Sequence, residues 1–147
     1  MKRAPVRRRR PQAAGPGRII FISSESGIQI PAEMIHYGMT KSAQIAVARG
    51  IAETLAGTRI TCNSVLPGPT QSRGVTEFVD QMAQSKKVSV EQVHKEFFDH
   101  VRPTSLLKRF ITPEEVGAFV AFVASPLAAA TNGAALRVDG GVVKSAF

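Results

Sequence analysis

The chain has 147 residues, about the length of one domain, and its composition is that of a globular protein, with 44% hydrophobic and 20% charged residues. No apolar run approaches the roughly 20 residues that a membrane-spanning helix needs, which excludes a membrane-spanning protein. The single cysteine, Cys62, excludes an internal disulfide. We expect it to be a small core residue of a cytoplasmic protein, because reduced thiols are typical of that compartment.

The formal net charge of +8 is concentrated at the amino terminus. Residues 1–18 contain seven basic groups and no acidic one, so residues 19–147 carry a net charge of only +1. Arginine, proline and glycine are frequent in residues 1–17 and show no helical or strand period, so we predict a disordered basic tail there. A nucleic-acid-binding arm and a targeting peptide are the alternatives for this tail. We expect no nucleic-acid partner, since the body of the chain is nearly neutral.

After the tail, short apolar runs alternate with helical patterns. Residues 18–23 form a continuously apolar, β-branched run, as is typical of a strand buried on both faces of a parallel sheet. Residues 59–66 and 134–138 predict a second and a third strand. Good helix formers extend over about residues 36–56, and Gly57 is placed to end that helix. Strands that alternate with helices predict an α/β fold with a parallel sheet.

Three further helices are predicted in the second half of the chain. Two of them lie in a more polar region, at about residues 75–84 and 90–100. The third has a stronger start, because Thr112 can cap it, Pro113 suits the first helical position, and Glu115 completes a capping box.

The residues with the clearest chemistry lie where the first predicted strand meets the first predicted helix. Tyr37 and Lys41 are four residues apart on that helix, so their side chains leave the same face. A lysine ammonium beside a phenol favours the phenolate form electrostatically, which suits the tyrosine for proton transfer. Ser24 lies at the carboxyl end of the strand, where open parallel sheets place their ligand crevices. A hydroxyl there can donate to a substrate oxygen while the tyrosine gives or takes a proton.

Four features of the sequence occur in a characteristic order. They are Ile22-Ser23-Ser24 at the end of the first predicted strand, the pair Tyr37 and Lys41, the segment Asn63–Gly68, and the segment Val138–Gly141. In this order and with these separations they resemble the short-chain dehydrogenase/reductase family. The resemblance covers about residues 17–147.

The resemblance implies a Rossmann-like, doubly wound parallel sheet and an oxidoreductase that moves a hydride between NAD or NADP and a carbonyl/alcohol pair. By position, Tyr37 corresponds to the catalytic acid/base of the family. Lys41 corresponds to the residue that favours the phenolate and binds the nicotinamide ribose. Ser24 corresponds to the hydroxyl that orients the small-molecule substrate.

The resemblance also implies cofactor contacts. Pro67 and Gly68 resemble the turn beside the nicotinamide ring. Family members usually have a hydroxyl residue shortly after this turn that contacts the carboxamide, and both Thr70 and Ser72 qualify. The implied cofactor-binding residues are therefore Tyr37, Lys41, Pro67, Gly68, Thr70 and Ser72.

The sequence departs from the family at its beginning. Family members open with a strand, a Thr-Gly-x-x-x-Gly-x-Gly turn and a helix whose N-terminus receives the cofactor pyrophosphate, and this sequence contains no such run. We therefore expect residues 18–147 to be the carboxyl-terminal half of such a domain, equivalent to its last three strands and their helices. The choice between NAD and NADP stays open, because the residue that selects between them belongs to the other half.

This interpretation predicts an exposed apolar surface. Without preceding strands, residues 18–23 would have a bare edge, and we expect the chain by itself to be marginally stable or prone to aggregate. In this family the helix that carries Tyr37 commonly forms part of a dimer interface, so we expect a homo-oligomer through it. The competing hypothesis is a non-enzymatic fragment or interaction module derived from the family.

Residues outside the family pattern have simpler interpretations. We expect Glu25 to be a solvated loop acid rather than part of the mouth of the site, and Asp139 to be structural. The three histidines lack metal-ligand spacing, so no metal site is predicted. We expect four phenylalanines to be core residues rather than a stacking platform: Phe97, Phe98, Phe119 and Phe122.

Overall fold

The computed structural model describes residues 15–146. Most of the predicted basic tail, residues 1–14, lies outside the described residues. The first strand begins at Gly17, one residue before the boundary that the sequence predicts.

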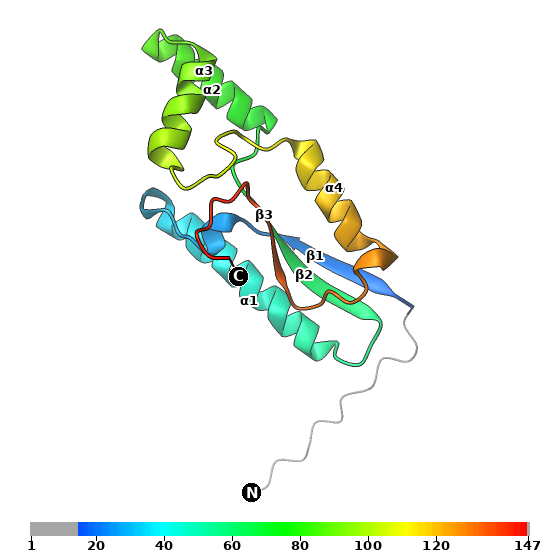
Figure 1. Ribbon diagram of the computed structural model, residues 1–147. Helices are drawn as coiled ribbons and strands as arrows, with labels where there is room; N and C mark the ends of the chain where they lie inside the picture. The colour runs from blue at the N-terminus through cyan, green and yellow to red at the C-terminus, as the bar shows by residue number, and fades with distance from the viewer. Residues whose placement is uncertain (1–14, 147) are drawn as a thin grey trace, which may run out of the picture.

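Three parallel strands form the sheet in the order β1 (Gly17–Ile22), β2 (Ile60–Pro67) and β3 (Ala135–Val138) (Figure 1). Strand β1 pairs with β2 over its whole length, from Gly17 opposite Ile60 to Ile22 opposite Val65. Strand β3 pairs with the second half of β2. The predicted α/β fold with a parallel sheet is confirmed.

Strand β2 is central, and its residues 61–66 are all buried. Cys62 is fully buried in a cluster with Ala48 and Ala52, which confirms it as a core residue, and burial raises the pKa of its thiol. The Asn63 carboxamide donates to the Thr131 carbonyl and accepts from the backbone N–H of Ala134. These bonds hold the loop before β3 against the centre of the sheet.

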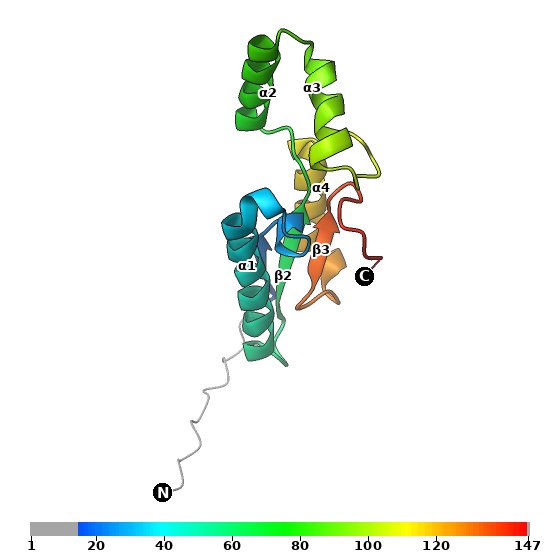
Figure 2. The ribbon, with the colours of Figure 1, turned by 90° about the vertical axis from the view of Figure 1, so that its left-hand side faces the viewer.

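Helices cover the two faces of the sheet. Helix α1 (Ile35–Thr54) packs on one face, mainly against β2, and α4 (Pro113–Ala124) lies on the other (Figures 1 and 2). Helices on both faces of a parallel sheet are the doubly wound arrangement that the sequence predicts. Three short 3₁₀ helices lie in the connections: η1 (Glu25–Gly27), η2 (Ala32–Met34) and η4 (Pro126–Ala128).

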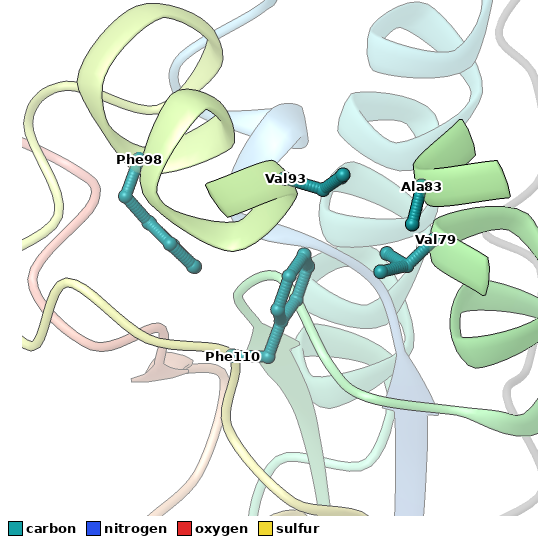
Figure 3. Close-up of a cluster of buried hydrophobic side chains, with 5 residues drawn as sticks. All are labelled: Val79, Ala83, Val93, Phe98 and Phe110. Atoms are coloured by element: carbon teal, nitrogen blue, oxygen red, sulfur yellow. The ribbon is translucent and has the colours of Figure 1, made fainter. Parts of the chain in front are cut away.

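A helical segment stands beyond the carboxyl ends of the strands (Figure 1). It comprises α2 (Arg73–Lys86), α3 (Val90–Glu96) and a π-helical turn, η3 (Phe97–Val101), which replaces the last turn predicted for α3. This segment has a core of its own (Figure 3). Its buried side chains are Val79, Ala83, Val93 and Phe98, and Phe110 from the connection before α4 packs with them.

Two predictions about burial are wrong. Ile19 and Ile22 are 37% and 48% exposed, so β1 is not buried on both faces. It is an edge strand of the described sheet, and the described helices leave these two side chains partly uncovered. Phe122 is likewise 48% exposed on α4 and is not a core residue. The bare apolar surface expected for a sheet without preceding strands is present.

The turns after β2 and β3 press against each other at Gly68. A Cβ atom placed there would lie 2.5 Å from the Asp139 carbonyl oxygen. Because this neighbour is backbone, Gly68→Ala should destabilise the chain by about 1–3 kcal/mol in urea unfolding. Gly117→Ala is the control, since a Cβ in that exposed part of α4 meets nothing within 4 Å. Gly117→Ala should stabilise the chain by about 0.5–1 kcal/mol. Equal effects of the two variants would contradict the close contact of Gly68 with the Asp139 backbone.

The predicted capping box of α4 is confirmed. The Thr112 hydroxyl accepts from the Glu115 N–H, and the Glu115 carboxylate accepts from the Thr112 N–H at 2.8 Å. The Nη1 and Nη2 groups of Arg109 also donate to this carboxylate. The Arg109 hydrogen bonds, followed by the bond from the Thr112 backbone, lower the pKa of Glu115 to about 2.

Because the pKa of Glu115 is lowered on folding, its contribution is present above the ordinary value of 4.5. It is lost as the pH falls toward about 2. Thermal unfolding between these pH values should therefore show a smaller loss of stability in Glu115→Gln than in the wild type. Glu114→Gln, which changes a neighbouring acid outside the capping box, should follow the wild-type curve.

Candidate active site

A cavity of about 920 Å³ lies between the carboxyl ends of β1 and β2 and the helical segment. Six of the seven residues that the sequence assigned to the site line it: Ser24, Tyr37, Lys41, Pro67, Gly68 and Thr70. The seventh, Ser72, is exposed at the start of α2 and is not among the lining residues. Of the two hydroxyl residues left open by the sequence, only Thr70 therefore faces the cavity.

Tyr37 and Lys41 meet on α1 as their spacing predicts. The Lys41 ammonium lies 5.6 Å from the centroid of the Tyr37 ring, within the range of a cation–π interaction. The same ammonium donates to the Ile22 carbonyl at 3.1 Å and to Gln44 Oε1 at 3.3 Å. Lys41 thus joins the end of β1 to the tyrosine face of α1, which fixes its charge beside the phenol.

The loop after β1 lies directly against α1 because Gly38 has no side chain. A Cβ atom there would lie 2.6 Å from Ile30 Cγ2 and 3.0 Å from the Ser26 carbonyl oxygen. The Ser23 hydroxyl donates to the Lys41 carbonyl at 2.8 Å and closes the same contact from the strand side. These contacts place the loop that carries Ser24 beside the turn of helix that carries Tyr37.

Ser24 is buried, and its hydroxyl makes two local hydrogen bonds. It donates to Glu25 Oε2 at 2.5 Å and accepts from the Ser26 N–H at 3.2 Å. Glu25 is itself only 4% exposed, so its prediction as a solvated loop acid is wrong. The reason is Arg102, which follows η3 and places its Nε 3.5 Å from Glu25 Oε1. A pattern read along the chain could not reveal this pairing, because the two residues are distant in sequence.

Asp139 supports the other side of the site. Its buried carboxylate accepts from the N–H groups of Gly141 at 3.1 Å and Val143 at 3.0 Å, and its main chain packs against Gly68. The structural role predicted for it is confirmed by these contacts. The turn after β3 therefore holds the Pro67-Gly68 turn at the edge of the cavity.

Other kinds of site find no support in the part of the chain that the structure describes. Residues 15–146 contain no group of three or more His, Cys, Asp or Glu side chains that could hold a metal ion. His94 instead packs edge-on against the Phe110 ring, with 5.0 Å between ring centroids. None of the described helices is both long and apolar enough to cross a membrane.

The chain is similar in sequence to known oxidoreductases. A family model described as enoyl-(acyl carrier protein) reductase matches residues 4–143. The chain is 44% identical over 131 residues to the uncharacterized oxidoreductase YvaG of Bacillus subtilis, covering 89% of this chain and 50% of that protein. It is 32% identical to D-beta-hydroxybutyrate dehydrogenase of Cupriavidus necator, covering 86% and 48%.

Among solved structures, L-sorbose reductase from Gluconobacter frateurii, in complex with NADPH and L-sorbose, superposes with a TM-score of 0.80 at 26% identity. The match covers 89% of this chain and 49% of that one. The chain belongs to the short-chain dehydrogenase/reductase family, and its fold is a partial Rossmann-like sheet. It spans about half the length of the curated relatives it matches.

The contacts of Lys41 can be tested by urea unfolding. Lys41→Met removes the hydrogen bonds to the Ile22 carbonyl and to Gln44 Oε1 and should destabilise the chain by about 0.5–1.5 kcal/mol. Lys95→Met removes an exposed pair with Asp99 and should change the free energy of unfolding by less than about 0.5 kcal/mol. Equal effects of both variants would contradict the role of Lys41 in joining β1 to α1.

Proposed function

We propose that this chain carries the proton-transfer site of a NAD- or NADP-dependent oxidoreductase that interconverts a small-molecule carbonyl compound and its alcohol. The observation that supports it most is the Lys41 ammonium held over the Tyr37 ring at the cavity beyond β1 and β2. Relatives and structural neighbours in the same family include a dehydrogenase and an NADPH-bound reductase.

The side chains divide the chemistry among them. In reduction, the Tyr37 hydroxyl donates its proton to the carbonyl oxygen, and in oxidation the phenolate takes the alcohol proton. The Lys41 charge stabilises the phenolate left after donation, because the two groups are close and share one face of α1. Ser24 orients the substrate oxygen from the loop after β1.

The residues present fit one end of a nicotinamide cofactor. Lys41 would hold the nicotinamide ribose together with Tyr37, and Thr70 would contact the carboxamide beside the Pro67-Gly68 turn, since all of these line one cavity. When bound, the cofactor supplies or accepts the hydride. The glycine-rich turn that receives the pyrophosphate in this family is not in the sequence, so the proposal concerns the nicotinamide end alone.

Helix α1 carries exposed apolar side chains that suit self-association. Ile35, Met39 and Val47 are 65%, 62% and 52% exposed on this helix, and exposed apolar side chains favour a protein contact. We include a homo-oligomer through α1 in the proposal on this ground.

A second candidate function is a non-enzymatic fragment or interaction module. The exposed edge of β1, with Ile19 and Ile22 uncovered, favours it, because such an edge can pair with another strand. Cofactor titration separates the two candidates, since only the oxidoreductase requires saturable NADPH or NADH binding.

The decisive experiment is turnover that depends on Tyr37. The full chain should bind NADPH or NADH saturably and reduce a carbonyl substrate from a panel of ketones and aldehydes. Tyr37→Phe should lower kcat by about 10²–10⁴-fold, because it removes the proton donor. Thr40→Val, on the same turn of α1, changes a hydroxyl that donates to the Tyr37 carbonyl and should retain turnover. A folded chain that binds neither cofactor contradicts the proposed function and favours the fragment.

A further inference from the structure

The Glu25 carboxylate is held by three groups inside the site. Its side chain is 5% exposed, and the hydroxyls of Ser24 and Ser26 donate to Oε2 and Oε1 at 2.5 and 3.1 Å. Arg102 Nε lies 3.5 Å from Oε1. A buried carboxylate is tolerated only where its charge is paired and its oxygens accept hydrogen bonds. This group is therefore built into the site rather than left at its rim.

The contact with Glu25 determines how Ser24 presents its hydroxyl. The hydroxyl has a single proton, which is directed to Glu25, while its oxygen accepts from the Ser26 N–H. These two bonds fix both the rotamer of Ser24 and the direction of its proton. A substrate oxygen can then take the place of the carboxylate as acceptor, at a Ser24 Oγ whose position these bonds have already fixed. Glu25 thus acts on substrate through Ser24.

Arg102 makes this carboxylate compatible with the proposed chemistry. Hydride transfer to a carbonyl places negative charge on the substrate oxygen, and an unpaired carboxylate next to Ser24 would oppose it. The Arg102 side chain is 12% exposed, so water screens its attraction to Glu25 less than at a surface pair. Arg102 therefore offsets the charge of Glu25 beside the substrate oxygen, while its second partner, Glu33, is more exposed to water.

Arg102 also belongs to a different part of the fold from Ser24. It directly follows η3, at the end of the helical segment, and its Nη1 donates to Glu33 Oε1 at 3.0 Å in η2. One guanidinium therefore joins the helical segment to the two connections that flank Ser24 and Tyr37. The η2 backbone, followed by the Arg102 hydrogen bond, lowers the pKa of Glu33 below its ordinary value.

We propose that Glu25 is a positioning residue for the Ser24 hydroxyl, and that Arg102 couples the placement of the helical segment to it. The proposal rests on the role proposed above for Ser24. It adds to the site two residues that stand outside the pattern of Ser24, Tyr37 and Lys41.

Amide hydrogen exchange on the full chain tests the coupling without requiring activity. The Ser26 N–H donates to Ser24 Oγ and reports whether that oxygen is held in place. Ser24→Ala removes the acceptor and defines the full loss of protection. Arg102→Gln should accelerate exchange of this amide by about tenfold, because the carboxylate that holds Ser24 loses its counter-charge. Arg102→Lys, which keeps the charge, should restore most of the protection.

Glu33→Gln is the matched control. It removes the other partner of Arg102 without touching Ser24, and the exchange of the Ser26 amide should stay at the wild-type rate. If Arg102 acted only by holding η2 in place through Glu33, Glu33→Gln would reproduce the effect of Arg102→Gln. That result overturns the proposal, as does unchanged exchange in Arg102→Gln.

A second variant covers the case in which Arg102→Gln does not fold. Glu25→Gln leaves Arg102 paired with Glu33, while its neutral amide holds the Ser24 proton less strongly than a carboxylate does. Exchange of the Ser26 amide should then rise by about threefold, since the bond is weakened and not removed. No change in this variant also overturns the proposal.

Measurements of turnover distinguish a failure of this proposal from a failure of the proposed function. In a chain with Tyr37-dependent turnover, Glu25→Gln should lower kcat by about tenfold with the same affinity for NADPH, because a misoriented hydroxyl weakens only the reacting geometry. An unchanged kcat overturns the positioning role. The exchange pattern without any turnover contradicts the proposed function and supports the linkage of Glu25, Ser24 and Arg102.

Discussion

The parallel pairing of β1 with β2 is the interaction on which the rest of this structure depends. Its register brings Ile22 opposite Val65, so both strands end at one edge of the sheet and their connections emerge together. Burial of β2 on both faces holds this register, because a slip of one residue would turn Cys62 away from α1. The cavity and the residues that line it follow from the position of that edge.

Close backbone contacts at this edge bring the residues of the site together. Gly38 lets the loop after β1 approach α1, and Gly68 lets the turn after β2 approach the turn after β3. Hydrogen bonds then hold these close contacts in place. Lys41 donates to a carbonyl at the end of β1, and Asp139 accepts from N–H groups of its own turn. Side chains supported in this way are held in place by the fold itself, as the proposed proton transfer would require.

The helical segment is well packed, whereas the free edge of β1 is left uncovered. The segment has its own buried cluster around Phe98 and Phe110, and Arg102 ties its end to the site. Strand β1 instead exposes Ile19 and Ile22, which a longer parallel sheet would cover. This exposure agrees with a chain that spans about half the length of its relatives.

The order of strands and helices, the capping box of α4, the shared face of Tyr37 and Lys41, and the family could all be predicted from the sequence. These features depend on local periods and on motif order, which a single chain displays directly. Only the tertiary structure decided that Thr70 and not Ser72 faces the cavity, that Phe122 is exposed, and that Glu25 is buried against Arg102. Each of these depends on contacts between residues far apart in the sequence, where no local period carries information.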